Sequence, residues 1–196
     1  MNSLKETLIK FSDTIEKSIK KINRYLDTEL EHDVFTNEFI KISSKTEDLI
    51  VEIIKLFLTN KQITLLNGSK KYSPFNLDIL TAENISIAID NFCVTFHKGN
   101  KVKKMESFLQ FINFKNELIC EEFFVRFNEL YKIRNCFSHP EKINNPLSKG
   151  QWQIKTTEDL IKYLKSSNKN GQGKNFEKHF NDILILIKSK ILKSTI

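Results

Sequence analysis

The six residues from Arg134 to His139 are the part of the sequence whose residue types could do chemistry. Arg134, Asn135 and His139 place a guanidinium, an amide and an imidazole close together. Arg is rare in this chain, and it occurs only at positions 24, 126 and 134. Its planar fork matches phosphate oxygens, whereas Lys is a compact point charge. The motif therefore predicts a site for a phosphate group. The alternative is a helix C-terminus at which Arg134 and His139 are cations that interact favourably with the helix dipole.

Helix geometry limits how these groups can converge. On a continuous helix, Asn135 and His139 would share a face, but Arg134 and His139 would point about 140° apart. Pro140 disfavours helical geometry at the preceding residue, which is His139. We therefore expect the helix to end at His139, which frees the imidazole to swing back toward Arg134. A second copy of the motif across a dimer interface is the other way to bring the groups together.

The motif lies at the end of a predicted helix over residues 115–138. The helix is predicted from apolar residues that recur at helical spacing, which include Leu118, Ile119, Phe123, Phe127, Leu130, Tyr131 and Ile133. The same periodicity predicts helices over 3–30, 81–97, 101–112 and 176–193, and a short helix from Thr156 or Thr157 to about Leu164. The segment 34–42 is apolar, and a helix is one interpretation of it. Ser44, Lys45, Thr46 and Glu47 form a capping box that predicts a helix to about Asn60.

Turn residues separate these predicted helices over 61–80, 141–155 and 166–175. The chain has only 5 Gly and 3 Pro in 196 residues, and no segment has a convincing strand pattern. We therefore expect an all-α fold, a bundle of about five main helices with short accessory helices. The length suits a single domain over residues 1–196, and 40% hydrophobic residues suit a folded core.

The positive charge of the chain is concentrated after the motif. Residues 142–196 contain 11 Lys and 4 acidic residues, whereas residues 1–141 contain 20 of each sign. A basic C-terminal portion over 142–196 can attract phosphate backbones or anionic surfaces. The alternative is a solvated, lysine-rich face without a nucleic-acid partner.

The cysteines and histidines do not predict a metal site. Cys93, Cys120 and Cys136 are odd in number and lack CxxC spacing, so we expect reduced core thiols in a cytoplasmic protein. We interpret His32 and His179 as surface or groove residues, because neither has a partner at metal-ligand spacing. We expect no cofactor, no signal peptide and no membrane span.

The residues around the motif carry a resemblance to a known family. Residues 130–140, with the sequence Leu-Tyr-Lys-Ile-Arg-Asn-Cys-Phe-Ser-His-Pro, resemble the R-N-x-x-x-H motif of the HEPN superfamily. The resemblance implies a helical HEPN-like domain with metal-independent endoribonuclease activity that leaves a 2′,3′-cyclic phosphate and a 5′-hydroxyl. Arg134 would then bind the scissile phosphate, His139 would transfer a proton, and Asn135 would orient the imidazole or the phosphate.

The resemblance also implies partners. It implies a homodimer with two motifs facing each other at the interface, RNA as substrate, and an antitoxin or defence-system partner, since such domains occur in toxins and abortive-infection proteins. Some toxin members carry a Tyr two residues after the His, as the target of a nucleotidyltransferase antitoxin. This chain has Glu141 there, which weighs against that particular partner.

Four further residues are weaker candidates for substrate binding, namely Tyr131, Ser138, Lys142 and Trp152. A Trp among Lys residues can stack on single-stranded RNA, but a Trp that packs the loop down is an equal alternative. Tyr131 also fits the core, and Ser138 also fits a helix end. The alternative for the whole chain is a non-catalytic module of the same fold that binds RNA, a nucleotide or a protein.

Overall fold

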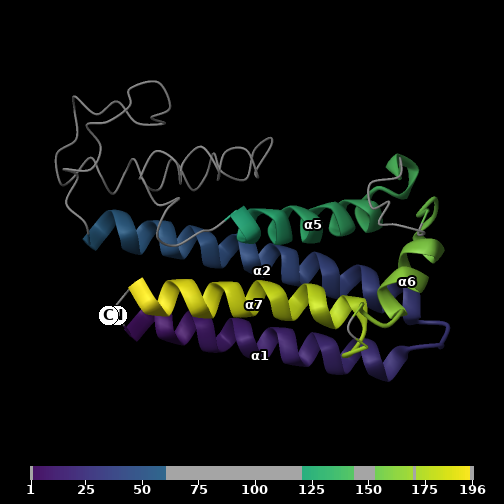
Figure 1. Cartoon of the computed structure of the whole chain (residues 1–196), viewed down its shortest axis with the longest axis horizontal. Helices are drawn as coiled ribbons and strands as arrows, with labels where there is room; N and C mark the ends of the chain where they lie inside the picture. The colour runs from purple at the N-terminus through teal and green to yellow at the C-terminus, as the bar shows by residue number, and fades with distance from the viewer. Residues whose placement is uncertain (1, 61–120, 144–152, 170, 195–196) are drawn as a thin grey trace.

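Four long helices lie side by side in the structure, a computed structural model that describes residues 2–60, 121–143, 153–169 and 171–194 (Figure 1). They are α1 (Asn2–Tyr25), α2 (Glu31–Asn60), α5 (Glu121–Ser138) and α7 (Asn175–Ser194). The short helix α6 (Thr157–Lys165) crosses one end of the bundle, and the 3-10 turn η4 (Pro140–Lys142) follows α5. The predicted all-α class is confirmed.

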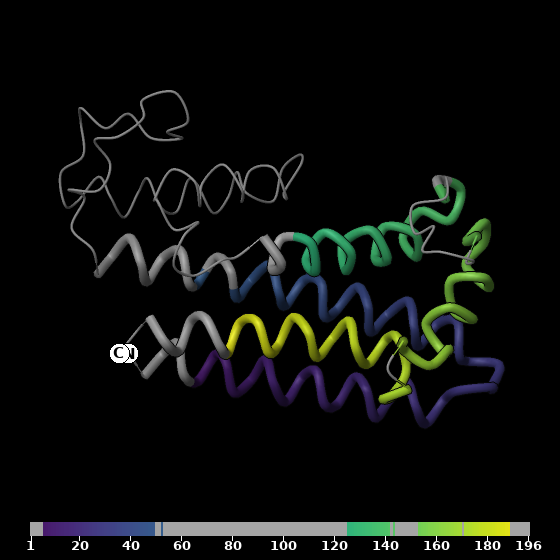
Figure 2. The backbone as a smooth tube through the Cα atoms, in the orientation of Figure 1, coloured from purple at the N-terminus to yellow at the C-terminus, as the bar shows by residue number. Residues whose placement is uncertain are grey.

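The order of the helices brings distant parts of the sequence to one end of the bundle. The backbone trace shows that α1 and α2 run in opposite directions, and that α7 lies beside α1 (Figure 2). α5 ends and α7 begins at the end that α6 crosses, where α1 also turns into α2. This end therefore holds the motif. None of the described helices is both long enough and apolar enough to cross a membrane.

The core of the bundle contains a cluster of phenylalanine rings from three helices. Phe39 of α2 lies at its centre, with its ring centroid 4.7 Å from that of Phe180 in α7 and 5.6 Å from that of Phe137 in α5. Phe35 contacts Phe176 at 5.5 Å. All five rings are buried. Aromatic rings remove large apolar areas from water, so this cluster is a main source of stability.

Two predicted boundaries in the N-terminal part are wrong. The first helix ends at Tyr25 rather than near residue 30, because Asp27 takes a left-handed conformation with φ of 60°. The capping box at residues 44–47 does not begin a helix, since α2 runs through it without interruption. There the Thr46 hydroxyl donates to the carbonyl of Ile42 at 2.8 Å, and Glu47 is buried. Burial of a continuous apolar stripe thus overrides a local capping pattern.

The predictions for the C-terminal part are confirmed to within about a residue. Thr156 caps α6 through a capping box with Asp159. The loop before α7 contains Gly171 and Gly173, both with positive φ. The final helix spans Asn175–Ser194, against a predicted 176–193. The predicted helices over 81–97 and 101–112, and the turns over 61–80, lie outside the described residues.

A buried carboxylate ties α1 to α2. Glu38 is 2% exposed, and it accepts hydrogen bonds from Ser18 at 2.5 Å, Lys21 at 2.9 Å and Lys41 at 2.8 Å. Burial alone would raise the pKa of the Glu38 carboxyl. The hydrogen bonds from Lys41, Ser18 and Lys21, with the attraction of Lys41, outweigh burial and hold this pKa below its usual range.

We expect Glu38→Gln to lower the free energy of unfolding at pH 7 by about 1–3 kcal/mol, because charge-assisted hydrogen bonds are lost. A depressed pKa stabilises the fold above the unfolded pKa, and this contribution disappears as pH falls through the folded pKa. The difference between wild type and variant should therefore shrink from pH 7 toward pH 3, as measured by urea unfolding. Glu16→Gln, on the exposed face of α1, is the control. A difference that is constant with pH would contradict the prediction.

Candidate active site

Pro140 ends α5 where the sequence predicts. The last residue of the helix is Ser138, and His139 has φ of −141° and ψ of 68°, outside the helical region. Its backbone N–H still donates to the carbonyl of Asn135 at 2.8 Å. Pro140 then begins η4. The imidazole is therefore carried on the first non-helical residue after α5, and its side chain is 50% exposed.

Arg134 is oriented by its neighbours on α5. Its Nη1 donates to Oδ1 of Asn135 at 2.9 Å, and its guanidinium carbon lies 5.7 Å from the centroid of the Tyr131 ring. The side chain is half-buried. A guanidinium has five N–H donors, and Asn135 accepts from one of them. Asn135 thus orients the guanidinium in this structure, whereas the resemblance implies that it orients the imidazole or the phosphate.

Arg134 and His139 are at the same end of α5, but no hydrogen bond or ion pair of the described residues joins them. His139 instead lies beside Glu141, with 3.6 Å between Nδ1 and Oε1. The break of the helix at His139 is thus present, but it does not by itself join the imidazole to Arg134 within a single chain. A phosphate group would have to bridge the two side chains, or a second copy of the motif would have to supply one of them.

The residues between Arg134 and His139 fix the motif to the core. Cys136 and Phe137 are buried. The ring centroid of Phe137 lies 5.6 Å from that of Phe39 and 6.3 Å from that of His32. Burial raises the pKa of the Cys136 thiol, so it remains protonated and serves in packing. His32 lies on the surface, as predicted, and its side chain is 45% exposed.

The weaker candidates divide between the core and the motif surface. Tyr131 stacks on Phe127 with centroids 6.3 Å apart and also faces Arg134, so it joins the core to the motif. Ser138 is half-buried at the last position of α5. Lys142 is the last residue of η4, and its side chain is outside the part of the chain that the structure describes. Trp152 lies outside the described residues.

Several lysines of the basic C-terminal portion are paired within the bundle. Lys165 forms ion pairs with Asp27 and with Glu31, the latter at 2.7 Å. Lys178 pairs with Asp182 at 2.5 Å. Lys155, Lys162 and Lys169 are exposed. Of the lysines that the structure describes in this portion, some are therefore paired and others form an exposed basic surface.

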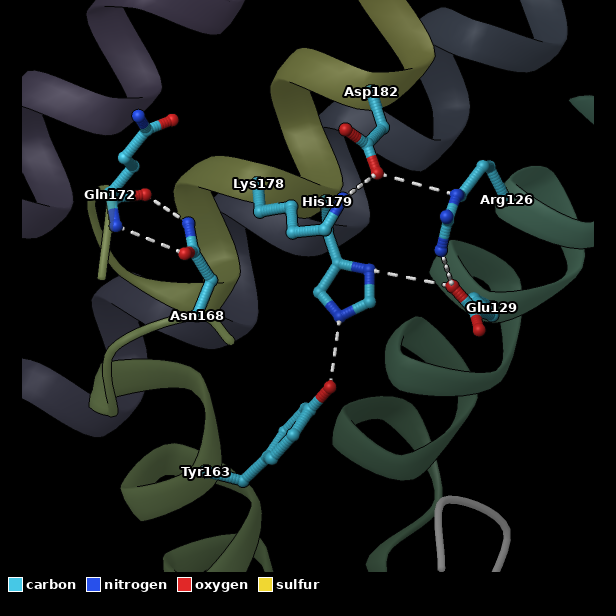
Figure 3. A network of polar contacts seen from close by, with 8 residues as sticks. All are labelled: Arg126, Glu129, Tyr163, Asn168, Gln172, Lys178, His179 and Asp182. Atoms are coloured by element: carbon cyan, nitrogen blue, oxygen red, sulfur yellow. Dashed lines mark hydrogen bonds and ion pairs between the residues drawn. The ribbon is translucent and has the colours of Figure 1, made fainter. Parts of the chain in front are cut away.

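A second polar site, between α5, α6 and α7, was missed by the sequence analysis (Figure 3). His179, interpreted from sequence as a surface or groove residue, is buried. Its Nε2 lies 3.5 Å from the hydroxyl of Tyr163, and its Nδ1 lies 3.8 Å from Glu129. Arg126 bridges Glu129 at 3.2 Å and Asp182 at 3.3 Å. The rarity of Arg was the only feature of the sequence that could have drawn attention to this site.

No family model, no curated protein and no solved structure matches the chain. Among the described residues, no three His, Cys, Asp or Glu side chains are grouped so that they could hold a metal ion. The motif at the end of α5 and the polar site between α5, α6 and α7 are the two candidate sites.

Proposed function

We propose that the chain is a HEPN-type endoribonuclease that cleaves RNA without a metal ion, in phage defence or in a cytoplasmic toxin–antitoxin system. One observation carries the proposal. Arg134 and His139 lie at the end of α5 on a segment fixed to the core by Phe137, and both side chains reach solvent. A half-buried Arg oriented by an amide is suited to bind a phosphate, and an exposed imidazole is suited to transfer protons near neutral pH.

In the proposed reaction, the 2′-hydroxyl of RNA attacks the adjacent phosphorus and the 5′-oxygen of the next nucleotide leaves. Arg134 stabilises the charge that develops on the phosphate oxygens. His139 removes the proton of the 2′-hydroxyl or protonates the leaving oxygen. The products are a 2′,3′-cyclic phosphate and a 5′-hydroxyl. Because no hydrogen bond or ion pair joins Arg134 and His139 within one chain, we propose that two motifs face each other in a homodimer.

The first test is cleavage of mixed RNA by the purified protein in EDTA, with analysis of the product ends. Arg134→Ala should lower cleavage by about 10²- to 10³-fold, the usual effect of losing a donor to the developing negative charge. Arg24→Ala is a matched control, because its guanidinium carbon also lies 5.7 Å from the centroid of a Tyr ring, that of Tyr25. Equal cleavage by wild type and Arg134→Ala, or cleavage that EDTA abolishes, would contradict the proposal.

The alternative is a non-catalytic module that binds RNA, a nucleotide or a protein. The hydrogen bond from Arg134 to Asn135 favours it, since this contact orients the guanidinium within α5 without a substrate. Toxicity on expression distinguishes the two. A ribonuclease should arrest growth, and His139→Ala should relieve the arrest. A binding module should show neither effect.

A further inference from the structure

A cavity of about 350 Å³ lies beside the second polar site. Its lining includes Arg126 of α5, Tyr163 of α6, and Lys178, His179 and Asp182 of α7. Arg126 precedes Arg134 by eight residues on α5, which is about 12 Å along a helix. The cavity is therefore separate from the motif at the end of α5. Its volume is at the lower end of the range for small-molecule pockets, so it suits a small ligand.

The side chains around the cavity form a connected polar network (Figure 3). The His179 side chain is 8% exposed and lies between Glu129 and the hydroxyl of Tyr163. Asp182 forms ion pairs with Arg126, at 3.3 Å, and with Lys178, at 2.5 Å. His179 and Tyr163 are buried, whereas Arg126, Glu129 and Asp182 are 15–25% exposed. Removing these polar groups from water, even in part, costs free energy that an apolar contact between the three helices would not. Networks of this kind that line a cavity are typical of binding and catalytic sites.

The charges that line the cavity favour an anion. Arg126, Lys169 and Lys178 outnumber the one acidic lining residue, Asp182, by two. Glu129 does not line the cavity, but it forms an ion pair with Arg126 and reduces the excess of positive charges to one. A phosphate monoester carries a charge of about −1.5 to −2 at pH 7, and an Arg fork matches its oxygens.

Tyr163 adds a hydrogen-bond donor to the cavity wall. Burial, together with the negative charge of Glu129, raises the pKa of the Tyr163 hydroxyl, and the positive charge of Arg126 opposes this only in part. The hydroxyl therefore stays protonated at neutral pH. Its one proton can go to a phosphate oxygen when Nε2 of His179 carries a proton and is the donor in the contact with Tyr163. The lining thus combines cations with a neutral donor and does not depend on a metal ion.

We propose that this cavity binds the phosphate group of a small phosphomonoester, of the size of a sugar phosphate or a mononucleotide. Arg126, Lys169 and Lys178 contact the phosphate oxygens, and Tyr163 donates to one of them. The rest of the ligand lies toward the α6–α7 loop. This site is independent of the proposed ribonuclease activity, and either proposal can fail without the other.

The test is calorimetric titration of the full-length protein with ribose 5-phosphate and AMP, beside ribose and adenosine. We expect the two phosphorylated compounds to bind and the two uncharged ones not to bind. Lys169→Gln and Lys178→Gln should each weaken binding about tenfold, because each removes a charge-assisted contact. Both lysines reach solvent, so their replacement should leave the fold intact. Lys162→Gln, an exposed position of α6 outside the cavity lining, is the matched control and should change the affinity less than twofold.

Three results would overturn the proposal. The first is no binding of either phosphorylated compound at millimolar concentration. The second is binding that the variants of Lys169 and Lys178 weaken no more than Lys162→Gln does. The third is an effect of these variants on the binding of single-stranded RNA without an effect on ribose 5-phosphate or AMP, which would make the cavity part of an RNA path.

Discussion

Replacing His139 with Ala should lower RNA cleavage by about 10²- to 10⁴-fold, the range expected for loss of a positioned proton-transfer group. The imidazole is 50% exposed and does not contribute to the apolar core, so the fold should be retained. We expect the melting temperature to stay within about 2 °C of wild type, as for other surface substitutions. The measurement is single-turnover cleavage of a defined single-stranded RNA in EDTA, together with a thermal melt of each protein.

His32 provides the matched control for this experiment. Its side chain is 45% exposed, similar to that of His139, and its ring contacts Phe137 within the motif. His32→Ala thus removes an exposed imidazole from the same end of the bundle without touching Arg134 or His139. We expect cleavage within about threefold of wild type for His32→Ala. If the two variants lose activity equally, the loss reflects disturbance of this end of the bundle and not proton transfer by His139.

The parts of the fold that the sequence predicted well are those set by local chemistry. Pro140 cannot continue a helix, and α5 ends two residues before it. Thr156 and Asp159 cap α6 through neighbouring backbone groups, and Gly171 and Gly173 take positive φ in the loop. Each of these features depends on residues within about four positions of each other. Such features can be recognised without knowing how the chain folds.

The parts that were missed depend on residues far apart in the sequence. Ser44 and Glu47 have the spacing of a capping box but lie inside α2, because packing of α2 against α1 and α5 buries residues on both sides of the supposed break. The His179 site needs Glu129 and Tyr163, which are separated from it by 50 and 16 positions. No spacing rule connects these residues. Sequence reasoning found the candidate motif, which is contiguous, and overlooked the site that three helices assemble.

The largest effect on stability is expected at Phe39. Phe39→Ala should lower the free energy of unfolding by about 3–5 kcal/mol, the cost of removing a buried aromatic ring and leaving a cavity. Phe39 has no exposed surface, and it contacts Phe35, Phe137 and Phe180. Urea unfolding followed by circular dichroism measures the loss. The slope of the unfolding free energy against urea concentration should be the same in both proteins, which shows that the two-state comparison is valid.

Two further substitutions test the reason for this loss. Ile9→Ala, at a side chain that is 52% exposed, should cost less than about 1 kcal/mol. Phe39→Leu keeps most of the apolar volume and should cost less than Phe39→Ala. A loss below about 1 kcal/mol for Phe39→Ala would mean that the ring cluster does not hold α2, α5 and α7 together. The motif would then lack its support, because Phe137 is the link through which Arg134 and His139 are fixed to the core.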